Sequence, residues 1–233
     1  MTKTAPLLLA AAILITLAVG CSPSIDAAAK ADIDRRIAAL RPPGQGYPAP
    51  TGFAPLPFQT GQWTQHKMID DSGNPSFLTY KIVGEDAGAF WIETVTDTYS
   101  GRTMMKMLLA IPNRMDPNGI DIRAASIKDK NGRVQTFEGP LLAMMRGSLK
   151  SMLSTLILSW QGLPQENAVV FAGTFAGCFK TRADATWGPW HSASTSWSHP
   201  AVPLSGLVKS QGIDKPHAME LVAFGLTGAV SEF

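Results

Sequence analysis

Hydrophobic and polar residues alternate through the middle of the chain, in short segments separated by turn residues. Aromatic and β-branched residues in such alternation are typical of strands with one buried face. The pattern predicts strands over residues 62–69, 77–84, 89–97, 103–111 and 120–128. Because the turns between them are too short to contain a helix, we expect an antiparallel meander.

A second set of strands is predicted farther along the chain. Asn131-Gly132 is a strong hairpin signal, because both residues tolerate the positive φ of a type I′ turn. Residues 168–182 read as one strand, with Val169, Phe171, Phe175 and Phe179 on one side and interrupted by glycines. Further strands are predicted near residues 190–198, 204–209 and 219–224.

Residues 140–160 interrupt the strand pattern and predict a strongly apolar helix. Its polar residues, including Arg146 and Lys150, fall at four-residue spacing and form one narrow stripe. Charges well inside the segment make a membrane span unfavourable, so we expect the helix to lie against the sheet. The fold class predicted is α+β: a curved antiparallel half-barrel of about eight to ten strands, with this helix on its concave face.

The beginning of the chain predicts export. One lysine precedes an apolar run over residues 5–20, which is short for a membrane span. The residues before Cys21 resemble the lipobox of bacterial lipoproteins, with Ala18 where leucine is most common. The resemblance implies cleavage after residue 20 and acylation of Cys21, with palmitate for example; an ordinary signal peptide is the alternative. Ser22, in place of an aspartate, favours a periplasm-facing outer-membrane location.

Residues 21–58 predict a lipidated tether. An alanine-rich helix is expected over residues 25–40, with Ser24 as its N-cap and Ile33, Ile37 and Leu40 on one face. Six prolines then predict an extended spacer over residues 41–58. The expected organisation is therefore a signal peptide over 1–20, a tether over 21–58 and one sheet domain over 59–233.

Composition narrows the classes of function. The formal net charge is +2, with 45% hydrophobic and 16% charged residues, so nothing indicates a nucleic-acid partner. With Cys21 acylated, only Cys178 remains, and the mature chain can form no internal disulfide. Cys178 is expected to be a small buried residue rather than a reactive thiol.

The order of an anchored cysteine, antiparallel strands, an apolar helix and more strands resembles the LolA/LolB superfamily of bacterial lipoprotein carriers. The resemblance covers about residues 62–233 and implies a half-barrel covered by helices. One dominant helix is visible here, where these carriers usually have more. Residues 172–181, 202–212 and 219–229 also resemble uncharacterised bacterial lipoproteins, and neither likeness supplies a catalytic residue to transfer.

The sequence contains no serine-hydrolase elbow, HExxH motif, phosphate loop or CxxC motif. The histidines at 66, 191, 199 and 217 have no metal-ligand spacing, and Asp116, Asn118 and Asp121 fit a hairpin better than a calcium loop. Glu93, Asp97 and Glu220 lie in separate strands with no pairing visible. We therefore expect no catalytic residue, metal or cofactor; an enzyme that uses these histidines or carboxylates is the third and weakest alternative.

Methionine concentrates in one strand and in the apolar helix, where it can adapt to ligands of variable shape. The expected function is a membrane-anchored protein that binds a hydrophobic ligand, such as an acyl chain or a lipoprotein's lipid. The candidate lining residues are Met105, Met107, Met145, Met152, Phe90, Trp91, Phe171 and Phe175. The alternative is a structural or interaction lipoprotein, accessory to an envelope complex, with a packed core and no ligand.

Overall fold

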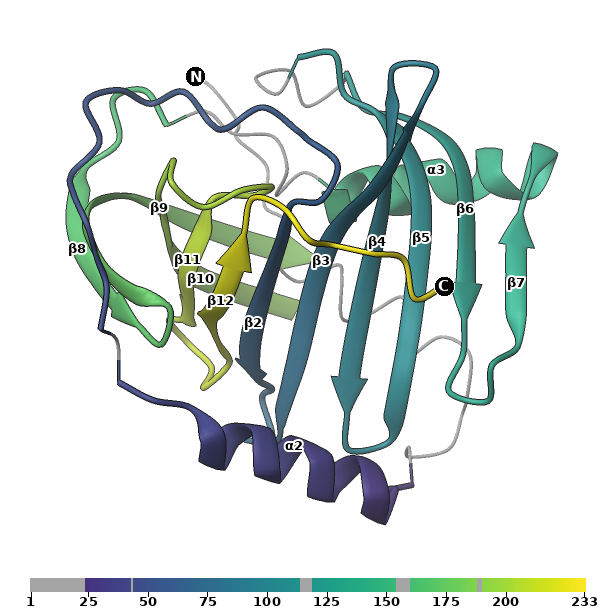
Figure 1. The fold of residues 1–233 in the computed structure, drawn as a ribbon, viewed down its shortest axis with the longest axis horizontal. Coiled ribbons are helices and arrows are strands. Elements are labelled where there is room, and N and C mark those ends of the chain that lie inside the picture. Colours follow the sequence, from purple (N-terminus) through teal and green to yellow (C-terminus); the bar gives the residue numbers. More distant parts are fainter. Residues whose placement is uncertain (1–23, 43, 114–118, 154–159, 188–189) are drawn as a thin grey trace.

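A computed structural model describes residues 24–42, 44–113, 119–153, 160–187 and 190–233 (Figure 1). These residues form two helices and one twelve-stranded sheet. The strands are β1 (Gly46–Tyr47), β2 (Trp63–Ile69), β3 (Pro75–Asp86), β4 (Ala89–Thr98), β5 (Gly101–Ala110), β6 (Asp121–Lys128), β7 (Val134–Phe137), β8 (Gln165–Val170), β9 (Gly173–Trp187), β10 (Trp190–Ser198), β11 (Leu207–Gly212) and β12 (Ala218–Gly225). The helices are α2 (Ala27–Ala39) and α3 (Gly139–Leu153).

The sheet is open and curved. Its strand order is β1-β9-β10-β11-β12-β2-β3-β4-β5-β6-β7, with β8 paired to β9. All pairs are antiparallel except β1 with β9, which is parallel. Figure 1 shows β9 and β10 bending behind the plane of β2–β5. The predicted curved, mainly antiparallel sheet is confirmed, and the strands outnumber the eight to ten expected.

The strands from β2 to β6 closely match the predicted segments, because local turn chemistry marks their ends. The hairpin between β6 and β7 is also confirmed, but its turn is not type I′. Gly132 has a φ of +79°, whereas Asn131 does not have a positive φ. The Asp129 carboxylate instead accepts hydrogen bonds from the backbone N–H groups of Asn131 and Arg133, both at 2.9 Å.

The prediction of one strand over residues 168–182 is wrong. The chain reverses at Phe171 and Ala172, so that β8 and β9 form a hairpin in which Val170 pairs with Gly173. Gly173 has a φ of +154°, and a Cβ there would lie 2.7 Å from the Tyr47 ring. The two central turn residues are neither glycine, proline nor asparagine. Gly173, directly after them, is a turn signal, which the sequence pattern treated as an interruption within one strand.

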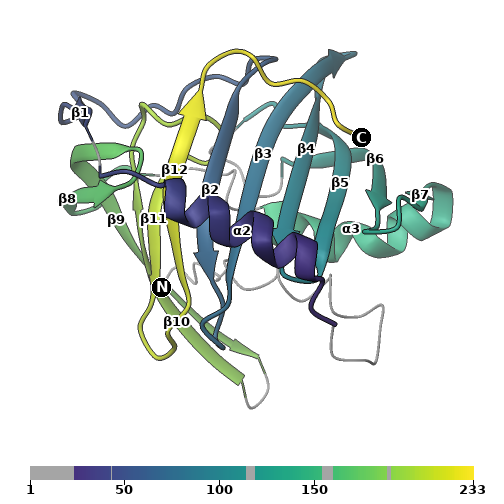
Figure 2. The same cartoon turned by 60° about the horizontal axis from the view of Figure 1, so that its bottom comes forward.

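Helix α2 packs on the sheet and is not part of a free tether. It begins two residues later than predicted: Asp26, rather than Ser24, is the N-cap, and its Oδ1 accepts from the Ala29 N–H at 2.9 Å. Ile33 is 1% exposed. Figure 2 shows α2 crossing β3, β4 and β5, in agreement with its contacts.

Part of the segment predicted as a proline-rich spacer also belongs to the sheet. Gly46 and Tyr47 form β1 beside β9. The Tyr47 ring stacks on Phe175, with ring centroids 4.3 Å apart. The structure therefore places residues on both sides of the expected boundary at residue 58 in one sheet.

Helix α3 lies where an apolar helix was predicted, but full coverage of the concave face is not confirmed. It packs against β6, and Leu142 and Leu149 are buried. Leu141 and Met144 are 40% and 74% exposed. Residues 154–159, the end of the predicted helix, lie outside the described residues. Within the described part of the chain, no helix is long and apolar enough to cross a membrane.

Alternating residues of the central strands divide the sheet into two faces. One, the core face, carries Ile82 of β3, Ile92 of β4 and Met107 of β5, which pack with Leu142 and Leu149 of α3. The other, the groove face, carries Lys81 and Glu93, which are register partners in β3 and β4. Helix α2 and residues 226–232 pass over this second face (Figures 1 and 2).

Candidate ligand groove

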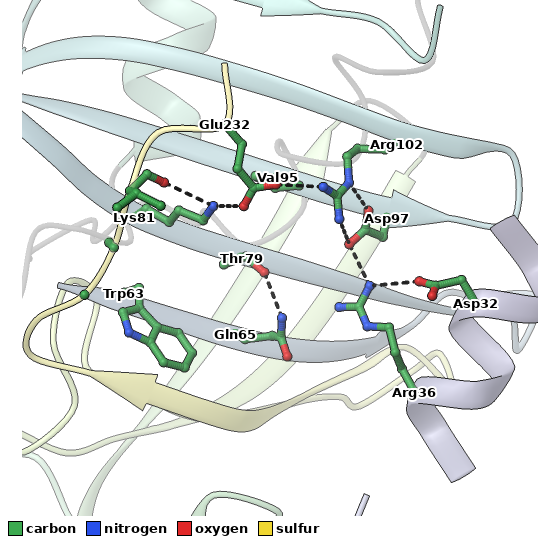
Figure 3. Close-up of a pocket in the computed structure, with 13 residues that line it drawn as sticks. Asp32, Arg36, Trp63, Gln65, Thr79, Lys81, Val95, Asp97, Arg102 and Glu232 are labelled. Atoms are coloured by element: carbon green, nitrogen blue, oxygen red, sulfur yellow. Dashed lines mark hydrogen bonds and ion pairs between the residues drawn. The ribbon is translucent and has the colours of Figure 1, made fainter. Parts of the chain in front are cut away.

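The groove face carries an open groove, which is bounded by α2, strands β2–β5 and residues 228–232 (Figure 3). Its volume is about 490 Å³, which lies within the usual range for small-molecule sites. Alternate residues of each strand point into it, because side chains at positions i and i+2 share a face. The lining side chains are Asp32, Arg36, Trp63, Gln65, Thr79, Lys81, Val95, Asp97, Arg102, Ala229, Val230 and Glu232, with the backbone of Gly228.

Asp97 joins α2 to the sheet at one end of the groove. Its carboxylate accepts from Arg36 Nη1 at 2.8 Å and from Arg102 Nε at 2.7 Å. Burial by itself would raise the pKa of Asp97, but the hydrogen bonds from Arg102 and Arg36 hold that pKa below its ordinary value. The Arg36 guanidinium also lies 3.9 Å from the centre of the Phe77 ring. Asp97 is therefore an ionised bridge between two guanidinium groups.

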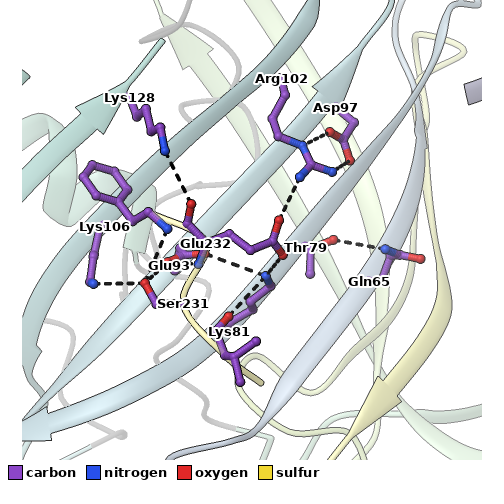
Figure 4. Close-up of polar contacts among 12 residues, drawn as sticks. Gln65, Thr79, Lys81, Glu93, Asp97, Arg102, Lys106, Lys128, Ser231 and Glu232 are labelled. Atoms are coloured by element: carbon purple, nitrogen blue, oxygen red, sulfur yellow. Dashed lines mark hydrogen bonds and ion pairs between the residues drawn. The ribbon is translucent and has the colours of Figure 1, made fainter. Parts of the chain in front are cut away.

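Glu232 forms the opposite wall of the groove (Figure 4). Its carboxylate pairs with Lys81 and, at 2.7 Å, with Arg102. The hydrogen bond with Lys81 is the main reason that the pKa of Glu232 is lowered. Arg102 thus connects Asp97 with Glu232, and the ion pairs continue across the groove.

Glu93 holds the segment that carries Glu232. Its side chain is fully buried, and it accepts hydrogen bonds from Ser231 Oγ at 2.8 Å and from the Glu232 N–H at 3.0 Å (Figure 4). Lys81 Nζ lies 3.7 Å from its Oε1. A buried carboxylate needs such partners, because an unpaired charge away from water is costly.

The predicted hydrophobic-ligand residues whose side chains the structure describes are not gathered in one cluster. Met105, Met107 and Phe90 belong to the core-face cluster, where Met107 is 1% exposed. Trp91 packs with Ala89, Leu108 and Ala110 in another cluster. Phe171 lies 5.6 Å from Lys67 Nζ, and Phe175 is fully buried in a third cluster around β8, β9 and β12. The Met145 and Met152 side chains and Cys21 lie outside the described residues.

The remaining candidate chemical groups are separate from one another. His66 is buried, its Nε2 lies 3.0 Å from the Leu207 carbonyl oxygen, and burial lowers its pKa to about 4. His199 contacts the Pro48 carbonyl oxygen, and His217 contacts Asp71. Within the described ranges, no three His, Cys, Asp or Glu side chains are grouped to hold a metal ion.

Cys178 is fully buried, as expected from the sequence. Burial raises the pKa of its thiol to about 12. Because the thiolate is the nucleophilic form, Cys178 is protonated and unreactive at neutral pH.

Sequence reasoning missed the groove. Glu93 and Asp97 were recognised as acidic strand residues, but their partners lie far away in the chain: Arg36 is 61 residues from Asp97, and Ser231 is 138 residues from Glu93. The one available signal was the presence of charged residues at alternate positions of strands otherwise rich in apolar residues. That pattern is typical of a strand with one solvent-exposed face, so it gave no indication that the charged face is buried as well.

Comparison with known proteins gives no family. No family model matches the chain, and no curated protein matches it significantly. One similar solved structure, of a proposed exported protein with a YmcC-like fold from Bacteroides fragilis, is 13% identical; the match covers 74% of this chain and 98% of that one, with a TM-score of 0.33. Another, of a proposed lipoprotein from Parabacteroides distasonis, is 14% identical, covering 73% and 97%, with a TM-score of 0.36. Similarity this low supports no inference about this chain.

Proposed function

We propose that this chain is a lipid-anchored protein of the bacterial cell envelope that acts by binding, not by catalysis. The lipobox-like residues before Cys21 support the anchor, and Ser22 favours an outer-membrane position facing the periplasm. We further propose that the binding surface is the groove face. Its partner is then a polar molecule, and the protein serves as an interaction module of the envelope.

The observation that carries this proposal is the contrast between a packed apolar core and an open polar groove. Met107 and Phe175, two of the predicted lining residues, are 1% and 0% exposed and lie in different clusters. Side chains packed in this way leave little room for an acyl chain, because protein cores have crystal-like density. The groove, by contrast, has about 490 Å³ of space and is lined mainly by polar groups.

A hydrophobic ligand remains a second candidate, and one observation favours it. Phe90, Met105 and Ile127 are only partly buried against the core-face cluster, so that cluster reaches the surface. An acyl chain could approach there. The two candidates differ in whether the purified protein carries lipid.

Lipid analysis of the purified full chain separates them. We expect no stoichiometric acyl lipid beyond the covalent anchor, and no saturable binding of a fluorescent fatty-acyl probe. Saturable uptake that is weakened by Met105→Trp would favour the hydrophobic-ligand candidate instead. The anchor is tested separately: Cys21→Ala should release the protein from the membrane fraction, and unchanged retention would contradict the lipoprotein assignment.

A further inference from the structure

The groove lining contains equal numbers of opposite charges. Arg36, Lys81 and Arg102 are basic, and Asp32, Asp97 and Glu232 are acidic. Each of the six takes part in an ion pair: Arg36 also approaches Asp32 at 3.6 Å, and the other pairs are described above. A charged ligand would have to break one of these pairs or leave a charge unpaired. The lining therefore favours a neutral ligand.

The same groups keep hydrogen-bonding capacity after pairing with one another. The ion pairs of Arg36 use only Nη1, which leaves Nε and Nη2 able to donate to a ligand. Gln65 donates through Nε2 to Thr79 Oγ1 at 3.2 Å, so its carbonyl oxygen can accept. A ligand that donates and accepts at neighbouring atoms, as adjacent hydroxyl groups do, matches this mixture of groups.

Trp63 supplies the aromatic ring among the side chains that line the groove. Its indole lies beside Gln65 in the lining (Figure 3). The register partner of Trp63 in the neighbouring strand β12 is Gly225, and a Cβ at Gly225 would lie 2.5 Å from Trp63 Nε1. The absence of a side chain at residue 225 thus makes room for the ring. An indole face packs well against the C–H groups of a sugar ring, which are apolar although the hydroxyls at its rim are polar.

We propose that this groove binds a neutral sugar unit, with Trp63 packing against the ring and Gln65 and Arg36 hydrogen-bonding to its hydroxyl groups. The proposal rests on the proposed function, because it names the class of ligand for the same groove. It excludes anionic sugars as preferred ligands, since the three basic residues already have acidic partners.

The test is a titration of the purified full chain with cellobiose and diacetylchitobiose, followed by tryptophan fluorescence and saturation-transfer NMR. Glucuronic acid serves as the anionic comparison. We expect saturable binding of at least one neutral disaccharide, at least tenfold tighter than that of the anion. Gln65→Ala should weaken it about tenfold, and Gln211→Ala, an exposed glutamine of β11 outside the groove lining, should leave it unchanged.

Trp63→Ala is a second variant, which should abolish binding; its thermal unfolding shows whether the fold is retained. If neither disaccharide binds, or if the anion binds more tightly, the sugar assignment is wrong. That result leaves the lipid analysis unaffected, so failure of this inference is distinguishable from failure of the proposed function. Equal loss of binding in the Gln65 and Gln211 variants would place the sugar outside the groove and would also overturn the assignment.

Discussion

The two faces of β3 and β4 are both buried, but by different means. On the core face, Ile82 and Ile92 are 0% and 1% exposed and pack with other apolar residues. On the groove face, the adjacent residues Lys81 and Glu93 are 8% and 0% exposed and are covered by charged and polar partners. The core face needs only exclusion of water, whereas the groove face needs particular partners in particular positions.

This difference has a consequence for function. Apolar packing fills the core closely and leaves no directed polar groups for a ligand. The ion pairs of the groove face hold guanidinium and carboxylate groups in fixed positions beside an open volume of about 490 Å³. Fixed polar groups reduce the conformational cost of binding, which is why the groove is the better candidate site.

The largest expected effect comes from placing a charge in the core. Leu149 of α3 is 1% exposed in the core-face cluster, so Leu149→Asp should lower the free energy of unfolding by about 4 kcal/mol or more. Met144 is 74% exposed on the same helix, and Met144→Asp should change it by less than about 0.5 kcal/mol. Urea denaturation followed by circular dichroism measures both. Equal stability of the two variants would mean that α3 does not close the core.

The sequence predicted strands β2–β6 well, because the strand pattern and the turn residues agree there. Strands β2–β6 follow each other in space and in sequence, and their turns contain Asp, Asn and Gly, so each boundary is determined within a few residues. The buried state of Cys178 followed from its residue type and its strand context. These features depend on neighbours in the chain, and one sequence is enough to reveal them.

The rest depended on contacts between distant residues. Strand β1 has two residues and exists because it pairs with β9, more than 120 residues away. The separation of Phe171 from Phe175 depends on a hairpin whose two central residues, Phe171 and Ala172, are not typical of turns. In the groove, Arg36, Asp97 and Glu232 come from three parts of the chain. Alternation shows that such residues share a face, but the identity of their partners requires the fold.

A pH titration should reveal two separate pH ranges in which stability is lost, one set by buried histidines and the other by the carboxylates of the groove face. The pKa of buried His66 falls from 6.5 to about 4 on folding, so the unfolded state binds more protons between these values and stability decreases as the pH falls through them. The expected loss is about 3 kcal/mol, and His199, whose pKa is also lowered by burial, acts in the same direction.

The groove face should respond at lower pH. The folded-state pKa values of Asp97 and Glu232 lie below their ordinary values of 3.8 and 4.5, so the stability they contribute is present above those values and is lost as the pH falls further. His66→Gln, which can keep a donor for the Leu207 carbonyl, should reduce the loss of stability between pH 6.5 and about 4 and leave the loss at lower pH unchanged. Urea midpoints from pH 7 to pH 3 give the measurement. An unchanged loss of stability between pH 6.5 and about 4 in this variant would show that His66 does not gain a proton on unfolding.

Removing a buried charge from the groove face should have a smaller effect. Glu93→Gln keeps the shape of the side chain but weakens its bonds with Ser231 and the Glu232 N–H, and we expect a loss of about 2 kcal/mol. Glu220→Gln is the matched control: its side chain is 32% exposed and lies 4.0 Å from Lys209, so the change should be below about 0.5 kcal/mol. Thermal unfolding compares the two. A loss no larger than the control's would mean that the groove face is buried without being stabilised by Glu93.

The smallest expected effect concerns the attachment of α2 to the groove face. Arg36, whose side chain is 23% exposed, contacts both Asp97 and the Phe77 ring, so Arg36→Ala should cost about 1 kcal/mol. Arg35 is 78% exposed and, among the described residues, pairs with its helix neighbour Asp32; Arg35→Ala should cost almost nothing. Because the Asp97 pair is partly exposed, added salt should reduce the difference between these variants, whereas the effect of Leu149→Asp should persist. A difference insensitive to salt would assign the attachment of α2 to the Phe77 contact rather than to the ion pair.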